Sequence, residues 1–77
     1  MKFSVHAYEM LKERNISEAL AKSAIDNPDW KCIGEDNNVH YFKTIKENEG
    51  RVLRVIVNEK VVPTMVVTVF FDRRARR

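Results

Sequence analysis

The sequence predicts an α+β domain in which two N-terminal helices pack on a four-stranded antiparallel sheet, in the order ααββββ. Apolar residues recur at helical spacing before Pro28 and at a spacing of two after it. The apolar segments of the second half are joined by short connections, and only antiparallel neighbours can be joined so tightly. Polar turns separate these segments at residues 35–38, 47–50 and 58–60.

Both helices have recognisable start and stop signals. Ser4 and Ser17 are good N-caps, because a serine hydroxyl accepts a hydrogen bond from a free amide of the first turn. Asn15 tolerates the left-handed conformation that often closes a helix. Residues 26–28 end the second helix, since the residue before a proline avoids the helical region. We expect the stripes that face inward to be Val5, Tyr8 and Leu11 in the first helix and Ile16, Leu20 and Ala24 in the second.

The second half of the chain reads as four strands at residues 30–33, 39–46, 51–57 and 61–71. Pro63 cannot donate to a ladder, which indicates an edge position or a bulge near the start of the fourth strand. The same strand is apolar on both faces near its end, which is typical of a strand buried on both sides or at an interface. Trp30 and Cys32 are expected to be buried.

The net charge of +3 comes from the end of the chain. Without the last four arginines, residues 1–72 hold ten basic and eleven acidic side chains. We therefore predict one nearly neutral domain at residues 1–72 and a basic tail at residues 73–77. The arginines of that tail are Arg73, Arg74, Arg76 and Arg77.

Several classes of protein are disfavoured by the composition. The single cysteine excludes an intrachain disulfide and a multi-cysteine zinc site, and it points to the reducing cytoplasm. No apolar run is long enough to span a membrane, and the start of the chain lacks a signal-peptide pattern. There is no glycine-rich phosphate loop and no metal-ligand spacing, so we expect no cofactor and no metal.

Arg54 stands out because it lies in the middle of an apolar strand. Either it pairs with a carboxylate on a neighbouring strand, or it points into a groove and binds a phosphate. His6 and Arg14 lie on about the same side of the first helix, about 12 Å apart along its axis. Such residues suffice for RNA cleavage by the 2′-hydroxyl, which needs a base, an acid and cations but no cofactor.

Two segments together resemble a known family. The first reads His6-Ala7, then Arg14, then Ile16-Ser17, and the second comprises the strands at 50–57 and 66–70. The pattern resembles a prokaryotic family of unknown function whose members begin His-Ala-x-x-Arg-Met-x-x-Arg-Gly-Ile-Ser. The residues that match it are His6, Arg14, Arg54 and Thr68, whereas Met10 stands at a position where the family has arginine.

That family is similar in organisation to the BrnT and RelE/ParE-like toxins, which are small α/β proteins of toxin–antitoxin systems that act as ribonucleases or on ribosomes. The resemblance implies a cytoplasmic, metal-independent endoribonuclease. His6 would be the general acid or base, and Arg14 and Arg54 would hold the scissile phosphate. Tyr41 is the candidate stacking or proton-transfer group, and the arginine tail would contact the RNA backbone.

The residues leave open whether the protein is an enzyme at all. The alternative is a non-catalytic interaction module that dimerises, or binds an antitoxin-like peptide, through its sheet. In that case the fourth strand would pair with the other chain. Direct DNA binding is disfavoured, because the second helix is not basic.

Overall fold

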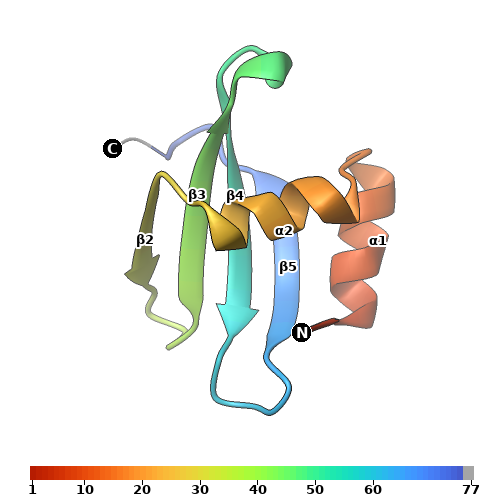
Figure 1. Ribbon diagram of the computed structural model, residues 1–77, viewed down its shortest axis with the longest axis vertical. Coiled ribbons are helices and arrows are strands. Elements are labelled where there is room, and N and C mark those ends of the chain that lie inside the picture. The colour runs from red at the N-terminus through yellow and green to blue at the C-terminus, as the bar shows by residue number, and fades with distance from the viewer. Residues whose placement is uncertain (76–77) are drawn as a thin grey trace.

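Two helices lie against one face of a five-stranded sheet in the computed structural model, which describes residues 1–75 (Figure 1). The helices are α1 (Val5–Glu13) and α2 (Glu18–Asp26). The strands are β1 (Lys2–Phe3), β2 (Trp30–Ile33), β3 (Val39–Ile45), β4 (Arg51–Asn58) and β5 (Met65–Phe71). A short 3₁₀ turn, η1 (Lys46–Asn48), joins β3 to β4. The predicted α+β class with two N-terminal helices is confirmed.

The sheet differs from the predicted four-stranded antiparallel one. Its order is β1-β5-β4-β3-β2, and β1 runs parallel to β5 while the other pairs are antiparallel. Lys2 lies opposite Met65, and Phe3 lies opposite Val66. A two-residue strand has no alternation to detect, so the sequence pattern could not indicate it. The sheet is therefore five-stranded and mixed.

The predicted helix caps are confirmed. The Ser4 hydroxyl accepts from the amide of Ala7 at 2.9 Å, and the Ser17 hydroxyl accepts from the amide of Leu20 at 3.0 Å. Asn15 adopts a φ of 55° between the helices. Ser4 also donates its hydroxyl hydrogen to the carbonyl of Val67 at 2.9 Å, which fixes the start of α1 on β5.

The predicted inward stripe of α1 is partly wrong. Val5 and Tyr8 are exposed, whereas Ala7 and Leu11 are buried against the sheet. Alanine lets the helix backbone approach the strands closely, and three-residue spacing of apolar residues fits more than one face of a helix. In α2 the fully buried residues are Ala21 and Ala24, for the same reason.

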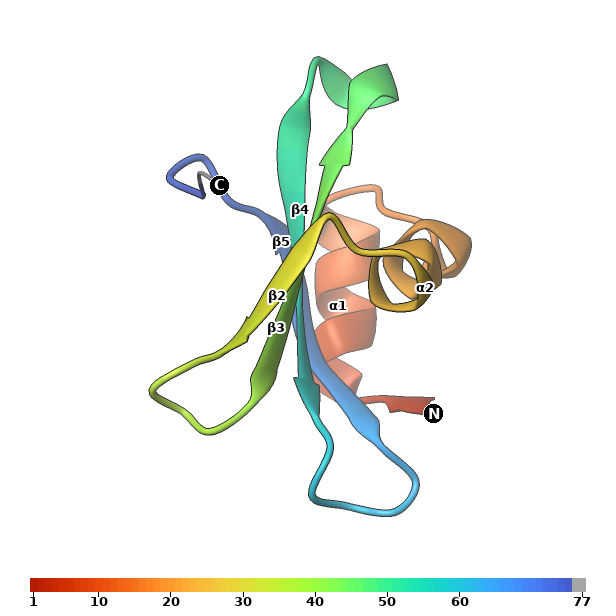
Figure 2. The same cartoon turned by 60° about the vertical axis from the view of Figure 1, so that its left-hand side comes forward.

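The core lies between the helices and the sheet. The alternate residues of β4 that point to the helices are Leu53, Val55 and Val57, and none is more than 1% exposed. Val66 and Val69 of β5 complete this layer. Figure 2 shows both helices on one side of the sheet, and the chain after β5 leaves on the other side. We call this other side of the sheet, formed by β2, β3, β4 and β5, the open face.

The strand at residues 61–71 begins later than predicted. Val61 and Val62 lie exposed in the loop before β5, and the Val62–Pro63 peptide bond is cis. Proline cannot donate to a ladder, so pairing starts beyond it. The ladder with β4 shifts register where Val57 pairs with Val66 and Ile56 pairs with Thr68, so an irregularity does lie near the start of β5, at Val67. Because β5 lies between β1 and β4, the edge strands are β1, which has two residues, and β2, which has four.

Within residues 1–75, neither nine-residue helix has the length or the apolar content needed to cross a membrane.

Candidate functional site

The open face carries one row of large side chains across four strands. Trp30 lies opposite Phe42, Phe42 lies opposite Arg54, and Arg54 lies opposite Phe70. Strand alternation puts all four on the face away from the helices, because Leu53 beside Arg54 points into the core. We call these four residues the aromatic row.

The members of the aromatic row contact one another through their flat groups. The rings of Trp30 and Phe42 are stacked, with centroids 4.8 Å apart and planes inclined by 6°. The guanidinium carbon of Arg54 lies 4.9 Å from the ring centre of Phe42 and 5.9 Å from that of Phe70. A guanidinium held between two rings loses little further freedom when it binds a ligand.

Arg54 is also held by two hydrogen-bonding partners. Its Nη1 donates to Asp72 Oδ2 at 2.5 Å, and its Nε donates to His40 Nδ1 at 3.0 Å. Of the two alternatives for Arg54, the pairing with a carboxylate is found, but that carboxylate belongs to Asp72, the residue after the end of β5. The side chain nevertheless remains 27% exposed, at a pocket of about 250 Å³. Arg54 is therefore both paired and accessible.

His40 fixes the orientation of Arg54. Arginine can only donate, so His40 Nδ1 must accept, and the ring proton lies on Nε2. That proton points to Asp36, whose Oδ1 is 3.0 Å away. Both ring nitrogens of this buried histidine are thus engaged. His40 positions Arg54 and is not free to act as a base.

The carboxylates at both ends of this chain of hydrogen bonds are stabilised in the charged form. The amide of Asn38 and then the ring of His40 donate to Asp36 and lower its pKa. Burial would raise the pKa of Asp72, but hydrogen bonds from Arg54 and the amide of Arg74 outweigh it and hold that pKa below its usual value.

The lowered pKa of Asp72 makes its contribution to stability depend on pH. Because the folded-state pKa lies below the unfolded one, the contribution is fully present above about pH 4 and disappears as pH falls through the folded-state value. We expect wild type to exceed Asp72→Asn by about 1–2 kcal/mol in free energy of unfolding at pH 7. Urea unfolding of both proteins at pH 7, 4 and 2.5 should show that this difference in free energy of unfolding becomes smaller as the pH falls. A difference that stays constant down to pH 2.5 would contradict the lowered pKa of Asp72.

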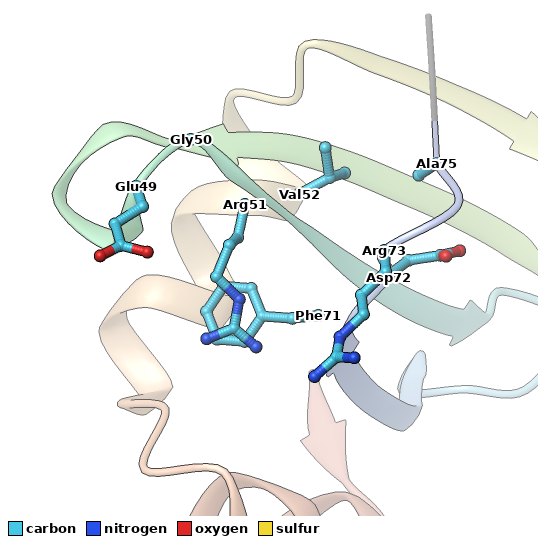
Figure 3. Close-up of a pocket in the computed structure, with 8 residues that line it drawn as sticks. All are labelled: Glu49, Gly50, Arg51, Val52, Phe71, Asp72, Arg73 and Ala75. Atoms are coloured by element: carbon cyan, nitrogen blue, oxygen red, sulfur yellow. The ribbon is translucent and has the colours of Figure 1, made fainter.

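A second cationic feature lies at the end of the sheet where β4 begins and β5 ends. Arg14, Arg51 and Arg73 line one pocket of about 330 Å³, together with Met10, Phe70 and Phe71. We call it the arginine pocket. Figure 3 shows Arg51 and Arg73 pointing the same way, with the ring of Phe71 behind Arg51. The guanidinium carbon of Arg51 lies 4.3 Å from the centre of that ring.

A protein-family model described as "Domain of unknown function (DUF4258)" matches residues 3–71, which is most of the chain. The chain belongs to the DUF4258 family. No curated protein and no solved structure shows a significant match to it. The predicted membership of a family of unknown function is confirmed.

The DUF4258 domain does not bring His6, Arg14 and Arg54 into one pocket. Arg54 lies on the open face, Arg14 lies in the arginine pocket, and His6 is exposed on α1 and lines neither. Helix α1 packs beside β5 on the opposite side of the sheet from Arg54. The three residues that the family pattern joined in sequence are therefore separated in space.

Tyr41 does not offer its ring for stacking. It is buried in the core on the helix side, and its hydroxyl donates to Glu59. Burial, followed by this bond to the carboxylate, raises the pKa of Tyr41 to about 12.

Trp30 and Cys32 were predicted to be buried, but both are more exposed than predicted. Cys32 is exposed, and Trp30 lies half-buried on the open face instead of in the core.

The predicted basic tail is not a uniform arm in the part that the structure describes. Arg73 lines the arginine pocket, whereas Arg74 and Ala75 line the pocket beside Trp30, Phe42 and Arg54. A hydrogen bond from the Arg74 amide to Asp72 shapes this turn. Arg76 and Arg77 lie outside the described residues.

The sequence interpretation missed His40, Asp72, Phe70 and Arg51 as site residues. A usable signal existed for two of them. Residues 40 and 70, like Arg54, alternate with core residues on their strands, so correct pairing of the strands would have placed them on one face. Asp72 lies beyond the end of β5, outside any alternation. Arg51 carried no signal, because it lies at a strand end, where a charged residue is ordinary.

Proposed function

We propose that this DUF4258 domain is a toxin-like ribonuclease that binds single-stranded RNA on its open face and cleaves it without a metal ion. The observation that carries the proposal is the aromatic row, with Arg54 held between rings on a face that no described element covers. The RelE- and BrnT-like character of the fold belongs to this proposal, and the family resemblance of the sequence supports it.

The aromatic row suits unpaired bases. Every base has a flat face that can stack on an aromatic ring, and a duplex hides these faces. Trp30 and Phe70, at the two ends of the row, are partly exposed, and the described tail adds Arg74 beside Trp30. Bases stacked on the two ends would bring the connecting phosphate over Arg54 between them.

The proposed cleavage balances without any other reactant. The 2′-oxygen of RNA attacks the adjacent phosphorus, the bond from phosphorus to the 5′-oxygen breaks, and the products are a 2′,3′-cyclic phosphate and a 5′-hydroxyl end. The proton lost by the 2′-hydroxyl passes to water, and water protonates the leaving oxygen. Arg54 would stabilise the charge that develops on the phosphoryl oxygens. His6 has no part in this scheme, because it lies on the helix side of the sheet.

The proposal can be tested with the fluorescence of Trp30, since it is the only tryptophan. We expect single-stranded RNA to quench it in EDTA, whereas duplex RNA should not. Phe70→Ala should weaken binding about tenfold or more, because one stacked base contributes about 1–3 kcal/mol. Single-stranded RNA incubated with the wild-type protein in EDTA should also acquire 2′,3′-cyclic-phosphate ends.

Tyr8→Ala is the matched control, since Tyr8 is an exposed aromatic residue on α1. Equal RNA affinity of Phe70→Ala and wild type would overturn the assignment of the open face. An equal loss of RNA affinity in Phe70→Ala and Tyr8→Ala would also contradict RNA binding on the open face.

A protein-interaction module is the second candidate function. It is favoured by the free side of β2, whose four residues end with Ile33, 72% exposed at the edge of the sheet. This module would pair its edge strand with a second chain and would have no use for the aromatic row. It predicts that neither single-stranded nor duplex RNA changes the fluorescence of Trp30.

A further inference from the structure

The arginine pocket gathers three cations from three separate parts of the chain. Arg14 is the C-cap of α1, Arg51 is the first residue of β4, and Arg73 follows β5 by two residues. Sequence distance between them is large, so their meeting is a product of the fold. The pocket is distinct from the pocket that contains Arg54 and Trp30.

No arginine of this cluster forms an ion pair with a carboxylate within residues 1–75. The ion pair in that part of the chain joins Arg54 to Asp72, and the contact of His40 with Asp36 is a hydrogen bond of the neutral ring. Glu49 and Asp72 line the adjoining cavity with Arg51 and Arg73. Asp72 is committed to Arg54, and Figure 3 shows its carboxylate turned away from the guanidinium of Arg73.

The pocket is partly organised before any ligand arrives. Arg51 is stacked on Phe71, which packs against the hydrophobic core. The backbone around Arg73 is set by the bonds from residues 72 and 74, since the amide of Asp72 donates to Val52 and the amide of Arg74 donates to Asp72. Holding like charges close together without a counter-ion costs free energy, which binding of an anion recovers.

We propose that the arginine pocket is a binding site for a phosphomonoester group. A guanidinium presents a planar fork of donors that matches two phosphate oxygens. A monoester has three free oxygens and a charge of about −1.5 to −2 at neutral pH, while a phosphodiester has two free oxygens and a single charge. Three arginines that form no ion pair within the described residues therefore match the monoester better. The proposal does not depend on the proposed RNA cleavage, although Phe70 of the aromatic row also lines the arginine pocket.

Two sources can supply this group, namely the phosphorylated end of an RNA strand and a free nucleotide or similar small molecule. Both share the terminal phosphate that the pocket would hold. The volume of about 330 Å³ leaves room beside the phosphate for part of a sugar against Met10 and Phe70.

Calorimetric titration with AMP, cyclic AMP and inorganic phosphate tests the proposal on the intact chain. We expect AMP and phosphate to bind, with AMP at least tenfold tighter than cyclic AMP, its diester counterpart. Arg51→Gln and Arg73→Gln should each weaken AMP binding about tenfold. Arg51→Lys, which keeps the charge but loses the fork, should lie between wild type and Arg51→Gln.

Lys22→Gln is the matched control, because Lys22 is an exposed cation on α2 that lines neither the arginine pocket nor the pocket beside Arg54. It should leave AMP binding unchanged. The proposal is overturned if AMP and cyclic AMP bind equally, or if Lys22→Gln loses as much affinity as Arg73→Gln. Circular dichroism of each variant shows whether it is folded.

Oligoribonucleotides with a 5′-phosphate or a 5′-hydroxyl distinguish the two sources. Tighter binding of the phosphorylated strand, lost in Arg73→Gln, assigns the pocket to an RNA end. Equal binding of the two strands, with AMP still bound, assigns it to a small molecule. Quenching of Trp30 by RNA reports on the open face, whereas AMP titration reports on the arginine pocket. The two measurements therefore distinguish failure of the RNA-binding proposal from failure of the phosphomonoester proposal.

Discussion

Arg54→Gln is expected to lower the rate of RNA cleavage by about two orders of magnitude. One donor aimed at the charge that develops in a transition state is typically worth about 10²–10³ in rate. Glutamine keeps a polar side chain between Phe42 and Phe70 but removes the positive charge. The rate is measured as the formation of cyclic-phosphate ends on a single-stranded oligoribonucleotide in EDTA.

A merely structural role for Arg54 predicts a different pattern across variants. Asp72→Asn breaks the same ion pair and leaves the cation in place. If Arg54 acts on the phosphate, Asp72→Asn should keep the cleavage rate within a few fold of wild type. If Arg54 only supports the sheet, Arg54→Gln and Asp72→Asn should lose cleavage activity to a similar extent. That result would show that the proposed role of Arg54 is wrong.

Leu53→Ala is expected to destabilise the fold by about 2–5 kcal/mol. Leu53 is fully buried where β4 faces the helices, and its removal leaves a cavity that neighbouring strands cannot close. A chain of this size has a total stability of about 4–12 kcal/mol, so much of the variant population would unfold on mild heating. Urea unfolding at 25 °C, followed by circular dichroism, measures the loss.

Val52→Ala is the control for this prediction. Val52 is the adjacent residue and lies half-buried on the open face. Its truncation should cost less than about 1.5 kcal/mol. Equal losses in the two variants would contradict the position of the core on the helix side of β4.

Local rules predicted much of the fold. The caps at Ser4 and Ser17, the left-handed Asn15 and the break at Pro28 each depend on one or two neighbouring residues, and each is confirmed. The four longer strands also followed from their period. What failed were features that depend on residues distant in sequence. β1 exists because β5 offers it a partner, and the inward face of α1 is chosen by the sheet.

The candidate sites illustrate the same limit. Arg54 was identified because a charge inside an apolar strand is unusual at any position in the sheet. Its partners His40 and Asp72 were missed, since they become neighbours only when the strands are paired in register. Arg51 carried no signal in the sequence and Arg73 was assigned to a basic tail, and only the fold brings them to Arg14.

Gly34 lies in the turn after β2, and the space beside it is occupied by the histidine that positions Arg54. A Cβ at this position would lie 2.4 Å from Nε2 of His40, whose other nitrogen accepts from Arg54. Backbone freedom is not what requires glycine here, since no left-handed φ is involved. The turn after β2 is therefore constrained by a side chain two strands away. A family alignment would show this as covariation between position 34 and residues 40 and 54.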